Sequence, residues 1–342
     1  MIRGMRLLVL GGTRFVGRAL VEQAAALGHQ VTTFNRGRTG QDVPGVEAVR
    51  GDRENAADLH ALVTGREWDW VVDTSGYVPQ VVGNVARLLS GRAGAYVFLS
   101  TVSVYPDWPA EPVDEASETY ECSPDMPGTA EDEANWTAAQ YGAYKVGCER
   151  AVQEAFKGQV TILRPGVILG PLENVGRLTW WLTRIARGGR VLAPGAAGKP
   201  IQPIDIRDLT AFTLSCLEKE ITGTFNITAP KGHATFGELL DACRAVTGSD
   251  AELTWVNDEF LVVRKVRQWT EIPLWRTPPG TWTVDSAKAT AAGLTCRPIE
   301  ETVRDTYAWL TESGGPLAYD RQAHHGLSPE RERELLQLWD RR

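Results

Sequence analysis

The chain has 342 residues, 43% of them hydrophobic, and a formal net charge of −7 at pH 7. This length predicts one large α/β domain or a domain with a smaller partner, and the negative charge argues against nonspecific nucleic-acid binding. Five scattered cysteines without a Cys-x-x-Cys pair indicate reduced thiols, not disulfides or a zinc site. No membrane span or signal peptide is evident. We expect a cytoplasmic monomer or homodimer with no metal, membrane or nucleic-acid partner.

The first strand and helix surround a glycine turn. Residues 7–10 predict a buried strand, which breaks at Gly11 and Gly12 before an amphipathic helix pattern over residues 16–27. A side chain at Gly11 would block the turn, and one at Gly17 would hold the helix away from the strand. The helix N-terminus offers N–H groups and a partial positive charge to a pyrophosphate. This order of elements predicts a dinucleotide-binding site.

Further strands alternate with helices along the chain. Strands are predicted at residues 30–35, 46–50, 70–73, 95–100 and 161–164, with helices at 56–64 and 82–89. This alternation predicts a doubly wound parallel α/β sheet with right-handed crossovers. After about residue 175, helices and short strands are interrupted by many Pro and Gly residues. We therefore predict a dinucleotide-binding domain over 1–174 and a smaller α/β substrate lobe over 175–342, with some segments returning to the first domain.

The connection over residues 107–140 holds ten acidic residues and no Lys or Arg. A connection of this length inside a compact domain is typical of a lid or an insert. We expect a mobile cover over the site. The alternatives are a solvated acidic loop, or a static loop anchored by Trp108 and Trp136 on the lobe or a second subunit.

Tyr141 and Lys145 lie one helical turn apart on one face. A phenol has a pKa of about 10, and a neighbouring ammonium lowers that pKa, so the pair is suited to proton transfer. Tyr144 has no lysine four residues later. Thr101 follows the strand at 95–100, at the edge where α/β sheets bind ligands, and its hydroxyl is suited to hold a substrate oxygen. The alternatives are a surface lysine beside a half-buried tyrosine and an ordinary strand-end hydroxyl.

Together these motifs resemble the extended short-chain dehydrogenase/reductases, through residues 11–17, 100–105, 141–145, 163–171, 204–209 and 223–227. The resemblance implies a Rossmann-type sheet, with Tyr141 as general acid/base, Lys145 as its helper and ribose ligand, and Thr101 as the substrate-binding hydroxyl. Residues 165–167 would lie beside the nicotinamide and residues 74–76 beside the phosphates. The cofactor-binding residues implied are Gly11, Thr13, Arg14, Phe15, Val16, Gly17, Asn35, Arg36, Arg38, Asp52, Arg53, Thr74, Ser75, Gly76, Lys145, Pro165, Gly166 and Val167.

Two departures from this family concern the cofactor. Arg14 replaces the middle glycine of the turn, a form similar to a branch that includes the chloroplast stem-loop binding proteins; its side chain either reaches a phosphate or packs outward. Asn35 replaces the acid that binds the ribose of NAD. A neutral side chain followed by Arg36 and Arg38 suits a 2′-phosphate. We expect NADP(H), with NAD(H) or a merely solvated basic turn as the alternatives.

A third departure concerns the substrate. Dehydratases of this family carry Asp-Glu where this chain has Val102 and Ser103, and many nucleotide-sugar epimerases carry an arginine at the position of Ile201. The late chain is rich in tryptophan, including positions 180, 181, 255, 269, 275 and 282, either in a core or beside an apolar pocket. We therefore expect an NADP(H)-dependent oxidoreductase, of carbonyl reductase or alcohol dehydrogenase type, for a small non-nucleotide organic substrate. The alternative is a sugar or nucleotide-sugar epimerase and, more remotely, a non-catalytic dinucleotide- or RNA-binding protein.

Overall fold

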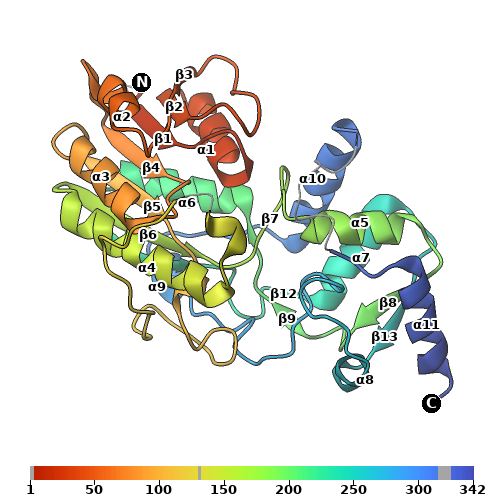
Figure 1. The fold of residues 1–342 in the computed structure, drawn as a ribbon. Coiled ribbons are helices and arrows are strands. Elements are labelled where there is room, and N and C mark those ends of the chain that lie inside the picture. The colour runs from red at the N-terminus through yellow and green to blue at the C-terminus, as the bar shows by residue number, and fades with distance from the viewer. Residues whose placement is uncertain (1–3, 130–131, 315–324) are drawn as a thin grey trace.

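Seven parallel strands form the central sheet of the computed structural model, which describes residues 4–129, 132–314 and 325–342. The strands are β1 (Arg6–Leu10), β2 (Gln30–Asn35), β3 (Glu47–Arg50), β4 (Trp70–Asp73), β5 (Ala95–Leu99), β6 (Gln159–Pro165) and β11 (Gly223–Ile227). Their order is β11-β6-β5-β4-β1-β2-β3. The chain therefore reverses direction across the sheet between β1 and β4, where doubly wound sheets bind their ligands. The predicted Rossmann-type fold is confirmed (Figure 1).

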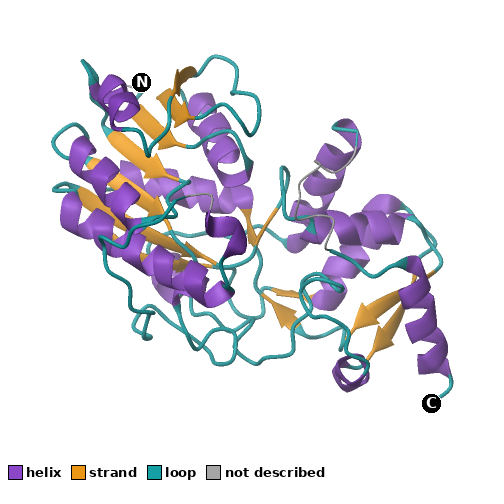
Figure 2. Ribbon diagram, in the orientation of Figure 1, coloured by secondary structure: helices purple, strands orange, loops and turns teal. Residues whose placement is uncertain are grey.

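Helices cover both faces of this sheet (Figure 2). They are α1 (Phe15–Ala26), α2 (Ala56–Val63), α3 (Pro79–Leu89), α4 (Ala138–Ala155), α6 (Ile206–Glu218) and α9 (Ala287–Ala291). Leu7 and Val9 pack among side chains of α1 and α6, whereas Leu8 and Leu10 pack among those of α2, α3 and α4. Burial on both faces explains why β1 is an uninterrupted apolar run in the sequence.

The predicted elements differ from the structure mainly at their ends. The strand predicted at 161–164 extends over Gln159–Pro165, and the helix predicted at 82–89 begins three residues earlier, with Pro79 in its first turn. Proline is favoured there because the first turn leaves its N–H groups unpaired within the helix. The edge strand β11 was not among the predicted strands. Together with α6, it returns to the first domain after the chain has entered the lobe.

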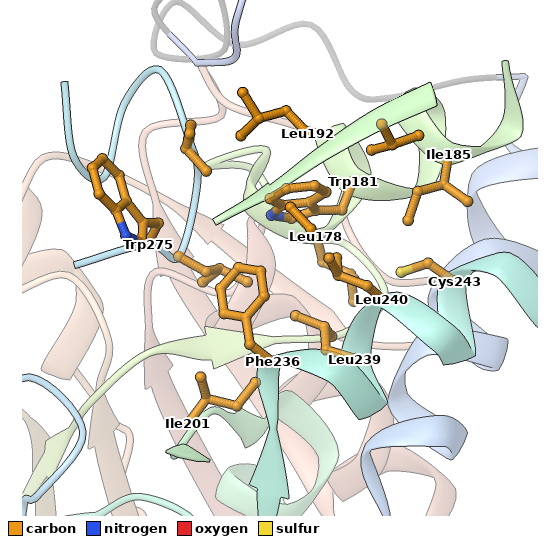
Figure 3. Packing of buried hydrophobic residues seen from close by; sticks show 14 of the residues in the cluster. Leu178, Trp181, Ile185, Leu192, Ile201, Phe236, Leu239, Leu240, Cys243 and Trp275 are labelled. Carbon is orange, nitrogen blue, oxygen red and sulfur yellow. The ribbon is translucent and has the colours of Figure 1, made fainter. Parts of the chain in front are cut away.

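The lobe surrounds a second hydrophobic core. Its elements are β7 (Ile168–Leu169), α5 (Arg177–Ala186), β8 (Arg190–Pro194), β9 (Pro200–Ile201), β10 (Ile204–Asp205), β12 (Ala234–Thr235), α7 (Phe236–Thr247), β13 (Glu252–Val256), α8 (Asp258–Val263), α10 (Ile299–Glu312) and α11 (Pro329–Asp340). Trp181 and Phe236 pack edge to face in the middle of this core, and Trp275 is buried at one side of it (Figure 3). Trp282 is also buried, while Trp180, Trp255 and Trp269 pack partly buried against the cluster. Most of the tryptophan signal is therefore core packing.

No helix in the described ranges combines the length and the apolar composition that crossing a bilayer requires.

Helix α4 lies unusually close to the turn that follows β5. That turn is a short 3-10 helix, η1 (Val102–Val104). A Cβ added at Gly142 would lie 2.0 Å from the carbonyl oxygen of Ser103. Since this oxygen belongs to the backbone, the close approach requires glycine, and it brings the first turn of α4 against the residues next to Thr101.

We predict that Gly142→Ala lowers the free energy of unfolding by about 1–3 kcal/mol, because the added methyl overpacks a rigid contact. Gly83→Ala on α3 is the matched control. Its Cβ would meet nothing closer than 3.4 Å, and removing a helical glycine stabilises by about 0.5–1 kcal/mol. Urea unfolding of both variants measures the difference. Equal effects would contradict the close packing of α4 on η1.

Candidate active site

The glycine turn after β1 has the shape of a phosphate cradle. Gly11 and Gly12 adopt φ values of +108° and +95°, which favour glycine. A Cβ at Gly17 would lie 2.8 Å from both the backbone nitrogen of Gly12 and Thr74 Oγ1. Helix α1 receives no side-chain cap from Arg14 and has no acidic residue in its first turn. Its first N–H groups are therefore suited to a pyrophosphate.

The neighbouring side chains of the turn bind the loop between β2 and β3. The hydroxyls of Thr13 and Thr39 lie 2.7 Å apart, and Arg14 Nε donates to the carbonyl of Thr39 at 3.2 Å. Phe15, the first residue of α1, has φ +34°, a strained value for a phenylalanine. Val16 packs its side chain against the sheet core.

Asn35 ends β2 and is held by several hydrogen bonds. Its Oδ1 accepts from the backbone N–H of Gly37 at 2.9 Å and from Arg50 Nη1. Arg36 Nη1 lies 3.8 Å from Asp52 Oδ2, and the Arg38 side chain is exposed. Sequence reasoning missed Arg50, although it is the last residue of the predicted third strand and so shares the edge with Asn35.

Arg53, implied as a cofactor ligand, forms a bidentate ion pair with Asp73 at 2.7 and 2.8 Å. Asp73 is fully buried at the end of β4 and also accepts a hydrogen bond from the hydroxyl of Tyr96. Burial alone would raise the pKa of Asp73, but the charge and hydrogen bonds of Arg53 hold that pKa below its ordinary value. Arg53 therefore also fixes the carboxyl end of β4, a role that the resemblance did not imply.

Residues 74–76 are fixed against β1 and α4. The hydroxyls of Thr74 and Ser75 donate to the carbonyl of Leu10 at 3.0 and 3.1 Å. The ammonium of Lys145 donates to the carbonyl of Gly76 at 2.9 Å and to that of Leu99 at 2.6 Å. Lys145 thereby joins α4 to the ends of β4 and β5. Burial lowers the pKa of Lys145 below its ordinary value.

Thr101 lies two residues after the end of β5 and caps η1. Its Oγ1 accepts from the backbone N–H of Ser103 at 3.1 Å. Tyr141 lies half-buried in the first turn of α4, one turn before Lys145. The hydroxyl of Tyr144 donates to the carbonyl of Pro127 at 3.1 Å, so this second phenol anchors the acidic segment.

Pro165, Gly166 and Val167 continue from β6 at the same edge of the sheet. The backbone N–H of Gly166 donates to the carbonyl of Ile227 at 3.1 Å, and a Cβ at Gly166 would lie 2.6 Å from Thr228 Cγ2. Val167 is buried, and its carbonyl accepts from the N–H of Ile204. This segment is therefore held against the strand that returns from the lobe.

A buried ion pair below the site also escaped sequence reasoning. Glu149, one turn after Lys145 on α4, accepts two hydrogen bonds from Arg164 at 2.6 and 3.0 Å. The same carboxylate accepts from Ser100 Oγ, next to Thr101. Arg164 also donates to the hydroxyl of Tyr105. The spacing of Lys145 and Glu149 was a visible signal, but nothing in the sequence identified Arg164 as the partner.

The acidic segment makes backbone contacts along much of its described length. The backbone N–H of Tyr120 donates to the carbonyl of Val104, and the N–H of Asp285 donates to the carbonyl of Val113. Near the end of the segment, the ring centres of Trp136 and Tyr144 lie 4.3 Å apart. These contacts favour the anchored loop over the mobile cover. Residues 130–131 of the segment lie outside the described residues.

A cationic group lies where the acidic segment meets the lobe. The guanidinium of Arg276 is 4.2 Å from the ring centre of Trp269 and 5.3 Å from that of Trp108. Among the described residues, the buried Arg276 Nη1 and Trp108 Nε1 find no hydrogen-bond partner. Burial and the nearby charge of Arg177 lower the pKa of Arg276 to about 10. An unpaired donor on the Arg276 guanidinium and another on the nearby Trp108 indole are together suited to an anion.

Comparisons with known proteins agree with this geometry. A model of the NAD dependent epimerase/dehydratase family matches residues 7–228. The chloroplast stem-loop binding protein of 41 kDa b of Arabidopsis thaliana is 26% identical over 260 residues, covering 71% of this chain and 63% of that protein. A 2-alkyl-3-oxoalkanoate reductase of Stenotrophomonas maltophilia is 30% identical over 209 residues, covering 56% of this chain and 58% of that protein. The chain thus spans about three fifths of the length of each relative.

Among solved structures, the enzyme WbmH of Bordetella bronchiseptica, in complex with NAD+, has the same fold. The TM-score is 0.69 at 16% identity, covering 91% of this chain and 100% of that chain. The family model covers well over half of the 342 residues, including the glycine turn, Thr101, Tyr141 and Lys145. The chain belongs to the NAD-dependent epimerase/dehydratase family.

Proposed function

We propose that this protein is an NADP(H)-dependent reductase or dehydrogenase acting on a carbonyl, or the matching alcohol, of a small organic substrate that carries an anionic group. The observation that carries the proposal is the position of α4. Its close packing on η1 and the hydrogen bonds of Lys145 put Tyr141, Lys145 and Thr101 at the carboxyl edge of the sheet, where the glycine turn also lies.

The residues at this edge fit a dinucleotide. The turn at Gly11, Gly12 and Gly17 takes the pyrophosphate, and residues 165–167 lie beside the nicotinamide, which supplies or accepts the hydride when bound. Lys145 uses two of the three ammonium donors on backbone carbonyls. The third donor is left for the ribose or the phenol of Tyr141.

Tyr141 and Thr101 act on the substrate oxygen. Tyr141 gives a proton to that oxygen during reduction and takes it back during oxidation. The ammonium of Lys145 favours the phenolate and so makes this proton transfer easier. Thr101 donates a hydrogen bond to the same oxygen and holds it near the phenol. The Glu149–Arg164 pair keeps the strand end and the helix in fixed positions for this transfer.

Arg276 and Trp108 support an anionic group on the substrate. Their unpaired donors lie at the border of the acidic segment and the lobe. The backbone N–H of Trp108 donates to the carbonyl of Tyr105, so Trp108 belongs to the same turn of chain that begins at Thr101 and η1. The name of the Stenotrophomonas relative describes a reductase of a ketone that carries a carboxylate, which supports this substrate class.

The second candidate is a sugar or nucleotide-sugar epimerase that retains its cofactor, because a phosphate also satisfies two such donors. Against it, Ile201 is fully buried in the lobe core, so no phosphate ligand is available at that position. RNA binding, suggested by the name of the Arabidopsis relative, fits poorly with a net charge of −7. Epimerisation of UDP-glucose, with cofactor released only on denaturation, would favour the epimerase.

We predict that Tyr141→Phe lowers the kcat of NADPH oxidation with 3-oxo acids by about 10²–10⁴-fold, because acid–base catalysis is lost. Binding of NADPH should not change, since the ring remains. Tyr144→Phe is the matched control and should keep its activity. It removes a hydroxyl whose hydrogen bond goes to the carbonyl of Pro127 in the acidic segment. A Tyr141→Phe enzyme with more than about a tenth of wild-type activity would show that another group transfers the proton.

We predict that Arg276→Met raises the KM for 3-oxo acids by about 10–100-fold, the effect of losing hydrogen bonds to a charged group. The KM for the corresponding methyl esters should not change. Thermal stability should stay the same or rise, because a half-buried cation without an ion-pair partner in the described residues is removed.

The control for this variant is Arg244→Met, which removes an exposed arginine paired with Asp241 on the surface of α7. Steady-state kinetics with acids and esters separate the outcomes. Equal losses for acid and ester in the Arg276 variant would reject an anion at this position, while leaving the role of Tyr141 intact.

A further inference from the structure

We propose that Arg50 selects NADPH by exchanging one anion for another: in the free protein it holds the carboxylate of Asp42, and with NADPH it holds the 2′-phosphate instead. This inference rests on the proposed NADP(H) preference and extends it to two residues outside the implied cofactor set. Three observations carry it, namely the position of Arg50, the geometry of its ion pair, and the place of Asp42 in the loop.

Arg50 lies beside the residue that faces the adenosine ribose in this fold. Asn35 and Arg50 are register partners at the carboxyl ends of β2 and β3. Arg50 Nη1 donates to Asn35 Oδ1, and Asn35 Nδ2 reaches toward the carbonyl of Gly11 at 3.4 Å. Because the side chain at the end of β2 is the one that contacts the ribose hydroxyls, a guanidinium bonded to it lies within reach of the 2′ position.

The ion pair of Arg50 has the geometry of phosphate recognition. Arg50 Nη1 binds Asp42 Oδ1 at 3.0 Å, and Nη2 binds Asp42 Oδ2. A carboxylate and a phosphate present the same pair of oxygens to a guanidinium fork. Asp42 therefore takes the position on Arg50 that a 2′-phosphate requires.

The loop that carries Asp42 lies over the cofactor turn. Thr39 binds Thr13 and Arg14, and the carbonyl of Gln41 accepts from Arg18 Nη1 at 2.9 Å. The Arg50 and Asp42 side chains are 48% and 26% exposed. An ion pair this accessible to water contributes little to stability, so a phosphate with a larger charge can replace the carboxylate without unfolding the loop. NADH has no such phosphate and leaves the pair closed.

The test is calorimetric titration of NADPH, NADH, 2′,5′-ADP and 5′-ADP into the full-length wild type and variants at one salt concentration. We expect Arg50→Ala to weaken NADPH and 2′,5′-ADP binding by about 10–100-fold and to leave NADH and 5′-ADP unchanged. Asp42→Asn should strengthen NADPH and 2′,5′-ADP binding by about 2–5-fold, since the competing carboxylate is gone. Arg50→Lys should restore part of the affinity, because the charge remains without the fork.

The matched controls are Arg66→Ala and Glu47→Gln, which break an ion pair of 3.2 Å at the opposite end of β3 and should change no affinity. The wild type could prefer NADPH while Arg50→Ala and Asp42→Asn leave NADPH affinity unchanged and Arg36→Ala lowers it. That result would overturn the role of Arg50 and leave the NADP(H) proposal intact. A wild type that binds NADH and 5′-ADP more tightly would overturn both.

Discussion

The site depends on one buried ammonium. Lys145 donates to the carbonyls of Gly76 and Leu99, which follow β4 and end β5, and its charge lies 4.3 Å from the ring centre of Phe98. A buried charge is costly unless its donors are satisfied. The two hydrogen bonds of this ammonium also hold α4 at the carboxyl edge of the sheet, so the position of Tyr141, one turn earlier on α4, follows from the hydrogen bonds of Lys145.

Two buried ion pairs flank this ammonium. Arg53 and Asp73 fix the end of β4, while Arg164 and Glu149 connect β6 with α4. In each pair a strand end contributes one charge and a different segment contributes the other. Removing one partner of such a pair leaves the other charge buried and unpaired, which lowers the free energy of unfolding by about 3–5 kcal/mol. The edge of the sheet is therefore rigid before any ligand arrives, as preorganised sites require.

The local features of this fold were predictable from the sequence. The apolar run of β1, the glycine turn and the Tyr141–Lys145 spacing each depend on residues within one or two turns of chain. The partners of Arg164, Asp73 and Arg50 depend on contacts between separate segments, and a single sequence carries no signal for them. Trp275 and Trp282 show a different limit of the sequence. A tryptophan suits an apolar pocket and a hydrophobic core equally, and only the packing in the structure shows that both lie in the core. Gly142 lies within the 141–145 motif, but the spacing of Tyr141 and Lys145 does not reveal that its missing side chain lets α4 approach η1.

The late arrival of β11 and α6 has a consequence for biosynthesis. Leu209 and Phe212 of α6 cover the same sheet face as Leu7 and Val9, and β11 pairs with β6 from more than fifty residues further along the chain. While residues 1–174 leave the ribosome, this face of their sheet is covered by α1 but not yet by α6, and the edge of β6 stays unpaired. Exposed apolar faces and open strand edges promote aggregation. The nascent first domain thus depends on continued translation or on chaperones until residue 227 emerges, so a fragment ending at residue 174 would make a poor expression target.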